Sequence, residues 1–200
     1  MAEKNDYVNR ELSWIEFNYR VLSEARDKST PLFDRLKFLS ITASNLDEFY
    51  MVRVASLKDM VHAKYAKKDI AGLTAKEQLD KISEKTHQLV DLQYSTYNRS
   101  LVPALKQNGL RIVMEHEDLT EDEAAFADEY FHKNVYPVLT PMAFDSSRPF
   151  PLIRNKTLNI AALLKKKNEK EAELEFAMVQ VPSVIPRIVE LPEEKDENGE

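Results

Sequence analysis

One asparagine, Asn45, is the side chain of this sequence best placed to bind a ligand. It lies in the segment SNLDEFY, residues 44–50, and on a helix its nearest neighbours are Ile41, Thr42, Glu48 and Phe49. An amide on this half-apolar face needs hydrogen-bond partners, because burying it unpaired costs about 1–3 kcal/mol. Two interpretations stay open. The amide bonds to a neighbouring helix or marks a helix bend, or it contacts adenine, whose N6 and N7 atoms match an amide's acceptor and donor.

The titratable residues form no recognisable active site in the sequence. Asp47 and Glu48 are adjacent, so on a helix they point about 100° apart and make a poor acid–base pair. The histidines are scattered, without carboxylates at metal-ligand spacing: His62, His87, His116 and His132. The sequence has no glycine-rich phosphate loop, and its lack of cysteine excludes disulfides and thiol nucleophiles. It therefore predicts no catalytic residue and no metal ligand in this chain.

Basic residues cluster only modestly. The chain carries 28 Lys and Arg against 34 Asp and Glu, a formal net charge of −6, so no basic field argues for nucleic acid as a partner. Lysines at 165–167 lie beside glutamates, which favours a solvated loop. Arg148 and Arg154 flank the stretch PFP, where they either contact phosphate or belong to an ordinary loop. A further cluster comprises Arg53, Lys58, Lys64, Lys67 and Lys68.

Capping signals and apolar spacing predict long helices in the first half of the chain. A capping box of Ser13 and Glu16 predicts the start of a helix that runs to about Arg26. A second helical stripe starts at Pro31, taken as the first helical position. This stripe is long enough to favour a bend near residues 44–45, at Ser-Asn.

The rest of the first half is also helical. Residues 64–72 read as a loop, and a capping box of Thr74 and Glu77 starts another helix. Pro103 and the Asn-Gly pair at 108–109 end or kink this helix. The spacing therefore predicts a helical bundle over residues 1–108.

The pattern changes after Gly109. A capping box of Thr120 and Glu123 predicts one helix, and the polar stretch 165–173 reads as a hairpin loop. Prolines lie too densely for regular structure at Pro137, Pro141, Pro149 and Pro151. Strands are predicted at residues 110–114, 157–164, 174–181 and 187–191.

We therefore expect an α+β chain, with an N-terminal helical bundle, residues 1–108, followed by a partial α/β head domain, residues 109–200. Its small, mainly antiparallel sheet ends in an acidic stretch, which suggests a truncated domain. No apolar run reaches the roughly 18 residues of a transmembrane segment, and no secretory signal is visible. The expected location is cytoplasmic, with peripheral membrane association left open.

Several short motifs follow one another along the chain. The first half carries ELSW at 11–14 with FN at 17–18, RLKFL at 35–39 and SNLDEF at 44–49. The second half carries PFP at 149–151, LNIA at 158–161, VP at 181–182 and IPR at 185–187. In spacing and order, the chain from about residue 7 to residue 192 resembles the N-terminal domain and the start of the head domain of bacterial polyphosphate kinase.

The resemblance implies that the parent protein is an enzyme. This family reversibly transfers the terminal phosphate of ATP to inorganic polyphosphate through a phosphohistidine, with Mg²⁺. The resemblance also implies that Asn45 contacts the adenine of ATP or ADP. The nucleophilic histidine and the Mg²⁺ ligands are expected outside this segment, so the 200-residue piece alone is expected to be inactive. A homo-oligomer formed through the head domain, with tunnel architecture, is also implied.

An alternative function from a different class is a stand-alone, non-catalytic dimerisation or interaction module. The missing nucleophile, metal cluster and phosphate loop favour it. A nucleic-acid binder is disfavoured, because the net charge is negative and the aromatic residues follow helical core spacing.

Overall fold

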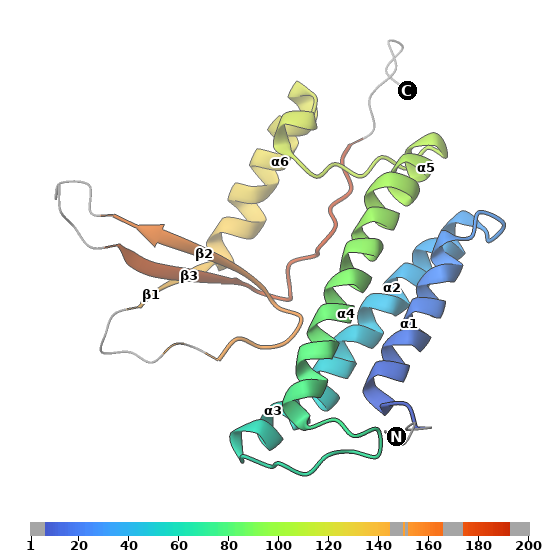
Figure 1. Cartoon of the computed structure of the whole chain (residues 1–200). Helices are drawn as coiled ribbons and strands as arrows, with labels where there is room; N and C mark the ends of the chain where they lie inside the picture. The colour runs from blue at the N-terminus through green and yellow to red at the C-terminus, as the bar shows by residue number, and fades with distance from the viewer. Residues whose placement is uncertain (1–6, 145–149, 151, 166–173, 193–200) are drawn as a thin grey trace. The chain divides into compact units, whose positions relative to one another are not determined.

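The structure, a computed structural model, describes residues 7–144, 150, 152–165 and 174–192. The chain divides into two compact units, Met1–Ile112 and Val113–Glu200, which can be followed by residue number with the colour bar of Figure 1. The first unit is helical, and the second combines a helix with a small antiparallel sheet. The predicted α+β class is confirmed.

Long helices lie side by side in the helical unit, where α1 packs against α2 and α4 (Figure 1). The elements of this unit are α1 (Arg10–Arg26), α2 (Leu32–Phe49), a π-helical turn (Tyr50–Val54), α3 (Ala55–His62), α4 (Ala75–Thr96), a second π-helical turn (Tyr97–Leu101) and α5 (Val102–Gln107). The predicted end of the first helix at Arg26 is confirmed.

The core of the helical unit is built from the inward faces of these helices. On α1 a fully buried stripe runs through Ile15, Asn18, Leu22 and Ala25, at the spacing of one helix face. Aliphatic and aromatic side chains of the other helices pack against it, among them Leu39, Phe49, Val54, Leu57, Ile82 and Leu89. Burial of each large side chain contributes roughly 1.5–3 kcal/mol, so this face holds the helices together. Asn18 is the polar exception in the stripe.

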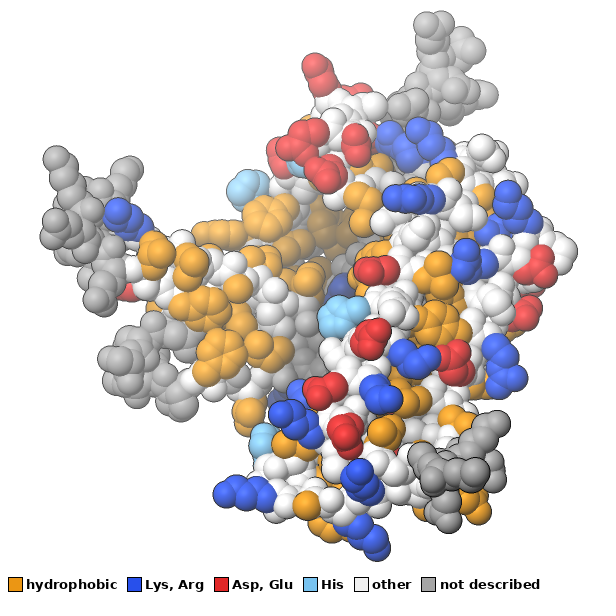
Figure 2. Space-filling view, viewed as in Figure 1, with side chains coloured by type: hydrophobic (Ala, Val, Ile, Leu, Met, Phe, Trp, Pro, Cys, Tyr) orange, Lys and Arg blue, Asp and Glu red, His pale blue; other side chains and the backbone are white. Residues whose placement is uncertain are grey.

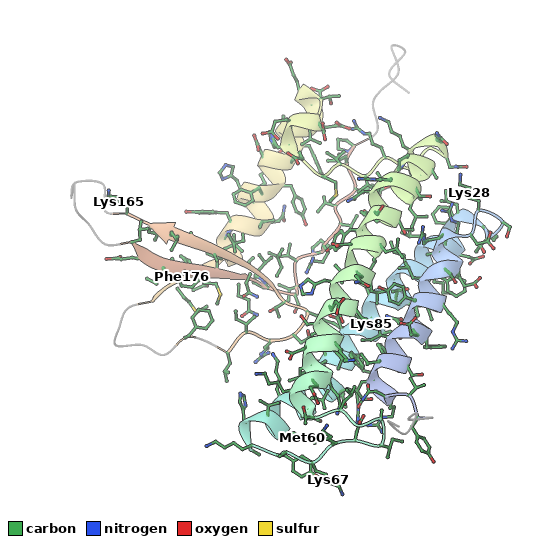
Figure 3. All side chains as sticks on the ribbon, viewed as in Figure 1. Lys28, Met60, Lys67, Lys85, Lys165 and Phe176 are labelled. Carbon is green, nitrogen blue, oxygen red and sulfur yellow. The ribbon has the colours of Figure 1, made fainter. Side chains whose placement is uncertain are left out.

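The predicted capping box of Ser13 and Glu16 is wrong. Asn9 is the N-cap of α1, and its Oδ1 accepts a hydrogen bond from the Leu12 amide at 2.9 Å. Ser13 therefore lies inside the helix. The Glu16 carboxylate pairs with the ammonium group of Lys85 on α4, labelled in Figure 3, so it serves a tertiary contact rather than the cap.

The other two capping boxes are confirmed. Thr74 and Glu77 cap α4 reciprocally, and Thr120 and Glu123 do the same for the helix of the second unit. At both sites the Thr hydroxyl accepts from the third backbone amide of the helix, and the Glu carboxylate accepts from the backbone amide of the Thr.

The predicted bend at residues 44–45 is wrong, because α2 continues through both residues. Asn45 does not interrupt the helix, since its side chain bonds across to α1. The irregularity falls later, in the π-helical turn Tyr50–Val54 between α2 and α3. Pro31 occupies the N-cap of α2, one position before its predicted place.

The second unit carries α6 (Glu121–Tyr130) and a three-stranded antiparallel sheet. The strand order is β1-β3-β2, with β1 (Thr140–Phe144) and β2 (Leu158–Leu164) on either side of β3 (Glu175–Val181). Met142 and Ala161 both lie opposite Met178, which is buried. Short helical turns precede α6 or follow it, at His116–Asp118, Phe131–Val135 and Tyr136–Val138.

Two strand predictions are confirmed to within one residue, and three predictions for residues 109–200 are wrong. The predicted strands at 157–164 and 174–181 correspond to β2 and β3; the predicted loop between them lies mostly outside the described residues. Residues 110–114 and 187–191 form no strand, since neither pairs with another segment of the sheet that the structure describes. Pro141 does belong to a strand, because β1 is an edge and the missing amide breaks no central ladder.

Hydrophobic side chains remain exposed on the sheet of the second unit. Ile160 and Leu163 of β2 are 52% and 68% exposed. Figure 2 shows this apolar surface in orange, whereas Lys, Arg, Asp and Glu are mixed over the visible face of the helical unit.

Candidate functional site

A cavity of about 420 Å³ opens between α1 and the end of α2. This volume falls in the roughly 300–1,000 Å³ range of small-molecule sites. Its walls combine aromatic, aliphatic, amide and charged side chains: Arg10, Glu11, Trp14, Phe17, Asn45, Glu48, Phe49, Val52 and Arg53. We call it the α1–α2 cavity.

Helical spacing brings these side chains to one place. Arg10, Trp14 and Phe17 recur every three or four residues along one face of α1. Asn45 and Phe49 recur in the same way along the facing side of α2. The π-helical turn Tyr50–Val54 then adds its own residues to the wall, at a type of helix irregularity that often accompanies functional sites.

Aromatic and aliphatic groups give the α1–α2 cavity an apolar wall. The rings of Trp14 and Phe49 stack with their centroids 4.4 Å apart and their planes 3° from parallel. Phe49 is buried, whereas Phe17 and Val52 are 47% and 52% exposed. The exposed ring and the branched aliphatic group supply surface on which a flat apolar ligand can pack.

Asn45 lies on the wall of this cavity, and a hydrogen bond to α1 fixes its amide. Its Nδ2 donates to Asn18 Oδ1 at 3.1 Å, and Asn18 Nδ2 donates to the Thr42 carbonyl oxygen at 3.1 Å. The amide thus bonds to a neighbouring helix, as one of the two interpretations predicts. Because it also lines the cavity, the second interpretation, an adenine contact, stays a prediction.

A buried carboxylate, paired with two arginines, forms part of the cavity wall. Glu11 is 4% exposed, and its carboxylate accepts from the guanidinium groups of both Arg10 and Arg53. Arg53 Nε lies 3.1 Å from Glu11 Oε1, so the π-helical turn is tied to the first turn of α1. With Glu48 also in the wall, two arginines face two glutamates and their formal charges cancel.

A second cavity of about 550 Å³ shares Arg10, Glu11 and Arg53 with the first. The loop between α3 and α4 supplies more of its wall, including Lys67, and α3 supplies Met60; both are labelled in Figure 3. Its cations are the shared arginines and exposed lysines of this loop, and the shared arginines are already paired with Glu11.

Asp69 organises that loop. Its carboxylate accepts from the amides of Ala71 and Leu73 at 3.0 and 2.8 Å, and from Asn9 Nδ2 at 2.6 Å. Burial raises the pKa of Asp69, but these hydrogen bonds, with one from the Gly72 amide, outweigh it and hold the pKa below its ordinary value.

The remaining sequence candidates do not converge. In the part of the chain that the structure describes, no three His, Asp or Glu residues lie close enough to hold a metal ion. His116 Nε2 lies 3.3 Å from Asp128, but both side chains are exposed. Glu48 lines the α1–α2 cavity, whereas Asp47 does not. Arg148 lies outside the described residues, and Arg154 is exposed.

Sequence reasoning missed the contributions of Asn18, Glu11 and Arg53 to this site. Asn18 carried a readable signal, since it is the polar residue at a position where the spacing of Ile15 and Leu22 requires burial. The Glu11–Arg53 pair had no such signal, because the π-helical turn shifts Arg53 relative to a regular helix.

Comparison with known proteins assigns the two units to consecutive domains of one class of phosphotransferase. Residues 7–113 match the polyphosphate kinase N-terminal domain, and residues 122–200 match the polyphosphate kinase middle domain. The chain therefore belongs to the polyphosphate kinase family, which confirms the resemblance seen in its motifs.

Individual relatives agree with this assignment. The chain is 55% identical to the polyphosphate kinase of Lactiplantibacillus plantarum, over 93% of this chain and 26% of the relative. It is 50% identical to that of Bacillus anthracis, over 94% of this chain and 27% of the relative. The crystal structure of polyphosphate kinase from Porphyromonas gingivalis superposes with a TM-score of 0.80 at 34% identity, over 94% of this chain and 27% of that one. The chain thus spans about a quarter of the length of the curated relatives that it matches.

No helix in the described parts of the chain is both long enough and apolar enough to cross a membrane.

Proposed function

We propose that the α1–α2 cavity binds the adenine of ATP or ADP in a polyphosphate kinase. The observation that carries this proposal is the position of Asn45, whose amide is fixed from behind and lies beside apolar surface in a cavity of ligand size. The residues present fit an adenine. The wall offers an amide for the base edge and the exposed surfaces of Phe17 and Val52 for its face.

The charges of the cavity favour a base over a phosphate group. Arg10 and Arg53 are engaged by Glu11, and Glu48 adds a second negative charge to the wall. An uncharged aromatic ring meets no electrostatic penalty there, whereas a triphosphate needs unpaired cations. The role of this cavity is therefore to hold the base, with the phosphates directed to other parts of the enzyme.

Holding the base contributes to phosphoryl transfer through orientation. The full-length enzyme would reversibly transfer the terminal phosphate of ATP to inorganic polyphosphate through a phosphohistidine. Such transfer depends on in-line alignment and on charge stabilisation around the phosphates. A domain that fixes only the base reduces the freedom of the nucleotide before reaction, without contributing a reacting atom. This chain by itself would then be catalytically inactive.

Mg²⁺ and the remaining partners would be held elsewhere. Bound Mg²⁺ neutralises phosphate charge in such reactions. The described residues offer no group of three carboxylates or histidines for it. We also propose that the head domain mediates homo-oligomerisation, with tunnel architecture in the assembled enzyme, and that the protein works in the cytoplasm.

The test replaces Asn45 with alanine in the full-length enzyme and uses Ser44→Ala as the matched control. Ser44 is an exposed neighbour on the same helix and does not line the cavity. We expect Asn45→Ala to raise the KM for ATP several-fold, because it removes hydrogen bonding to the base, and to change kcat less. Ser44→Ala should leave both values unchanged. An unchanged KM in Asn45→Ala would contradict the adenine contact.

A further inference from the structure

The hydrogen bonds behind Asn45 fix which of its amide atoms faces the ligand. The Thr42 carbonyl oxygen can only accept, so the Asn18 atom that contacts it must be the nitrogen, Nδ2. Asn18 then presents its oxygen to Asn45, and an oxygen can only accept. The Asn45 atom facing Asn18 is therefore also the nitrogen. Neither amide can be reversed without placing two acceptors against each other.

The oxygen of Asn45 is left for a ligand. No described residue donates a hydrogen bond to Asn45 Oδ1, and this atom is not among the buried side-chain polar atoms that lack a partner, so it is accessible. Asn45 is half-buried and lines the α1–α2 cavity, so its accessible amide atom is an acceptor. A ligand that contacts this oxygen has to bring a donor.

We propose that Asn18 is a positioning residue that makes this cavity selective for a purine with a 6-amino group. This inference rests on the proposed adenine site and adds its specificity. Adenine carries a 6-amino donor, which the Asn45 oxygen can accept, whereas hypoxanthine and guanine carry a 6-oxo acceptor there. The buried amide pair thereby converts an ambiguous asparagine into a site that discriminates between purines.

The surroundings of Asn18 keep this arrangement in place. Asn18 and Thr42 are fully buried, and Asn18 sits between Ile15 and Leu22 in the core stripe of α1. Rotating the Asn45 amide would leave the Asn18 oxygen in the core without a donor, and an unpaired buried group is costly. The orientation is thus built into the helix packing before the nucleotide binds.

The first experiment measures binding to the full-length enzyme by titration calorimetry without polyphosphate. The probes are ADP, inosine diphosphate, which has a 6-oxo group, and purine riboside diphosphate, which lacks any group at that position. We expect purine riboside diphosphate to bind about three- to tenfold more weakly than ADP, the loss of one hydrogen bond, and inosine diphosphate to bind more weakly still. Equal affinities for the three probes would overturn the proposal.

The second experiment compares two replacements of Asn18 that both disturb the core. Asn18→Asp keeps an oxygen that accepts from Asn45 Nδ2, and in this fully buried site its neutral carboxyl O–H replaces the amide as the donor to the Thr42 carbonyl oxygen, so the preference for ADP over inosine diphosphate should persist. Asn18→Leu removes that acceptor, which frees the Asn45 amide to rotate, and the preference should fall towards one. A loss of preference in Asn18→Asp, or its retention in Asn18→Leu, would show that the acceptor oxygen of residue 18 does not set the selectivity.

Different experimental outcomes would contradict the proposed adenine site and the proposed selectivity. If Asn45→Ala binds ADP as tightly as the unmodified enzyme, the cavity is not the adenine site. If Asn45→Ala weakens ADP and inosine diphosphate equally while the unmodified enzyme shows no preference, the adenine site stands and the selectivity does not. Should Asn18→Leu fail to fold, Asn18→Ala removes the same acceptor with a smaller side chain, and the same loss of preference is expected.

Discussion

Replacing Asn9 with alanine should destabilise the helical unit far more than the loss of an ordinary helix cap. Asn9 is 4% exposed, and its Oδ1 caps α1. Its Nδ2 donates to Asp69 Oδ2 at 2.6 Å and to Gln78 Oε1 at 2.9 Å. The cap contributes about 1 kcal/mol. The charged and neutral hydrogen bonds together add about 2–3 kcal/mol, so we expect a loss of about 3–4 kcal/mol in unfolding free energy.

Two variants separate the cap from the tertiary bonds. Asn9→Ser keeps a capping oxygen but has no Nδ2, so it should lose about 2–3 kcal/mol. Thr74→Ala removes the exposed cap of α4 and should cost about 1 kcal/mol. Urea unfolding followed by the fluorescence of Trp14, the one tryptophan of the sequence, reports on the helical unit itself. Equal losses in Asn9→Ala and Thr74→Ala would refute the reasoning, because the bonds to Asp69 and Gln78 would then contribute nothing.

Two further predictions concern the same unit. The pKa of Asp69 lies below its ordinary value of 3.8, so its carboxylate stabilises the fold above that pH, and the stabilisation is lost as the pH falls through the folded value. Asp69→Asn should flatten this acid dependence in urea unfolding at several pH values; an unchanged slope would contradict it. Thr86 Oγ1 is buried and accepts or donates no hydrogen bond among the described residues. Thr86→Val should therefore raise the unfolding free energy by about 1 kcal/mol, and a decrease would speak against that interpretation.

Local sequence signals predict the structure correctly where all of the interacting residues lie within one short segment. The capping boxes at Thr74 and Thr120 were predicted correctly, because both partners lie within four residues of each other. The box at Ser13 failed, since Asn9 has tertiary partners in Asp69 and Gln78 that no local pattern displays. Residues 110–114 have strand-like composition, but a strand also needs a partner.

The candidate site was predictable only in part, because its geometry also depends on contacts between helices. Asn45 was singled out because its amide lies in an apolar helical pattern, and the structure places it on a cavity wall. Its orientation depends on Asn18, which is 27 residues away in sequence. The charged side of the cavity depends on Arg53 reaching Glu11 from a π-helical turn. Contacts of this range arise from the packing of α1 against α2, which spacing within one helix does not describe.

The most direct test of the adenine site is a crystal structure of the full-length enzyme with bound ADP. We expect the base in the α1–α2 cavity, with its 6-amino group about 3 Å from Asn45 Oδ1 and one face against Phe17 and Val52. ADP bound with its base outside this cavity, and Asn45 without a contact to it, would contradict the account.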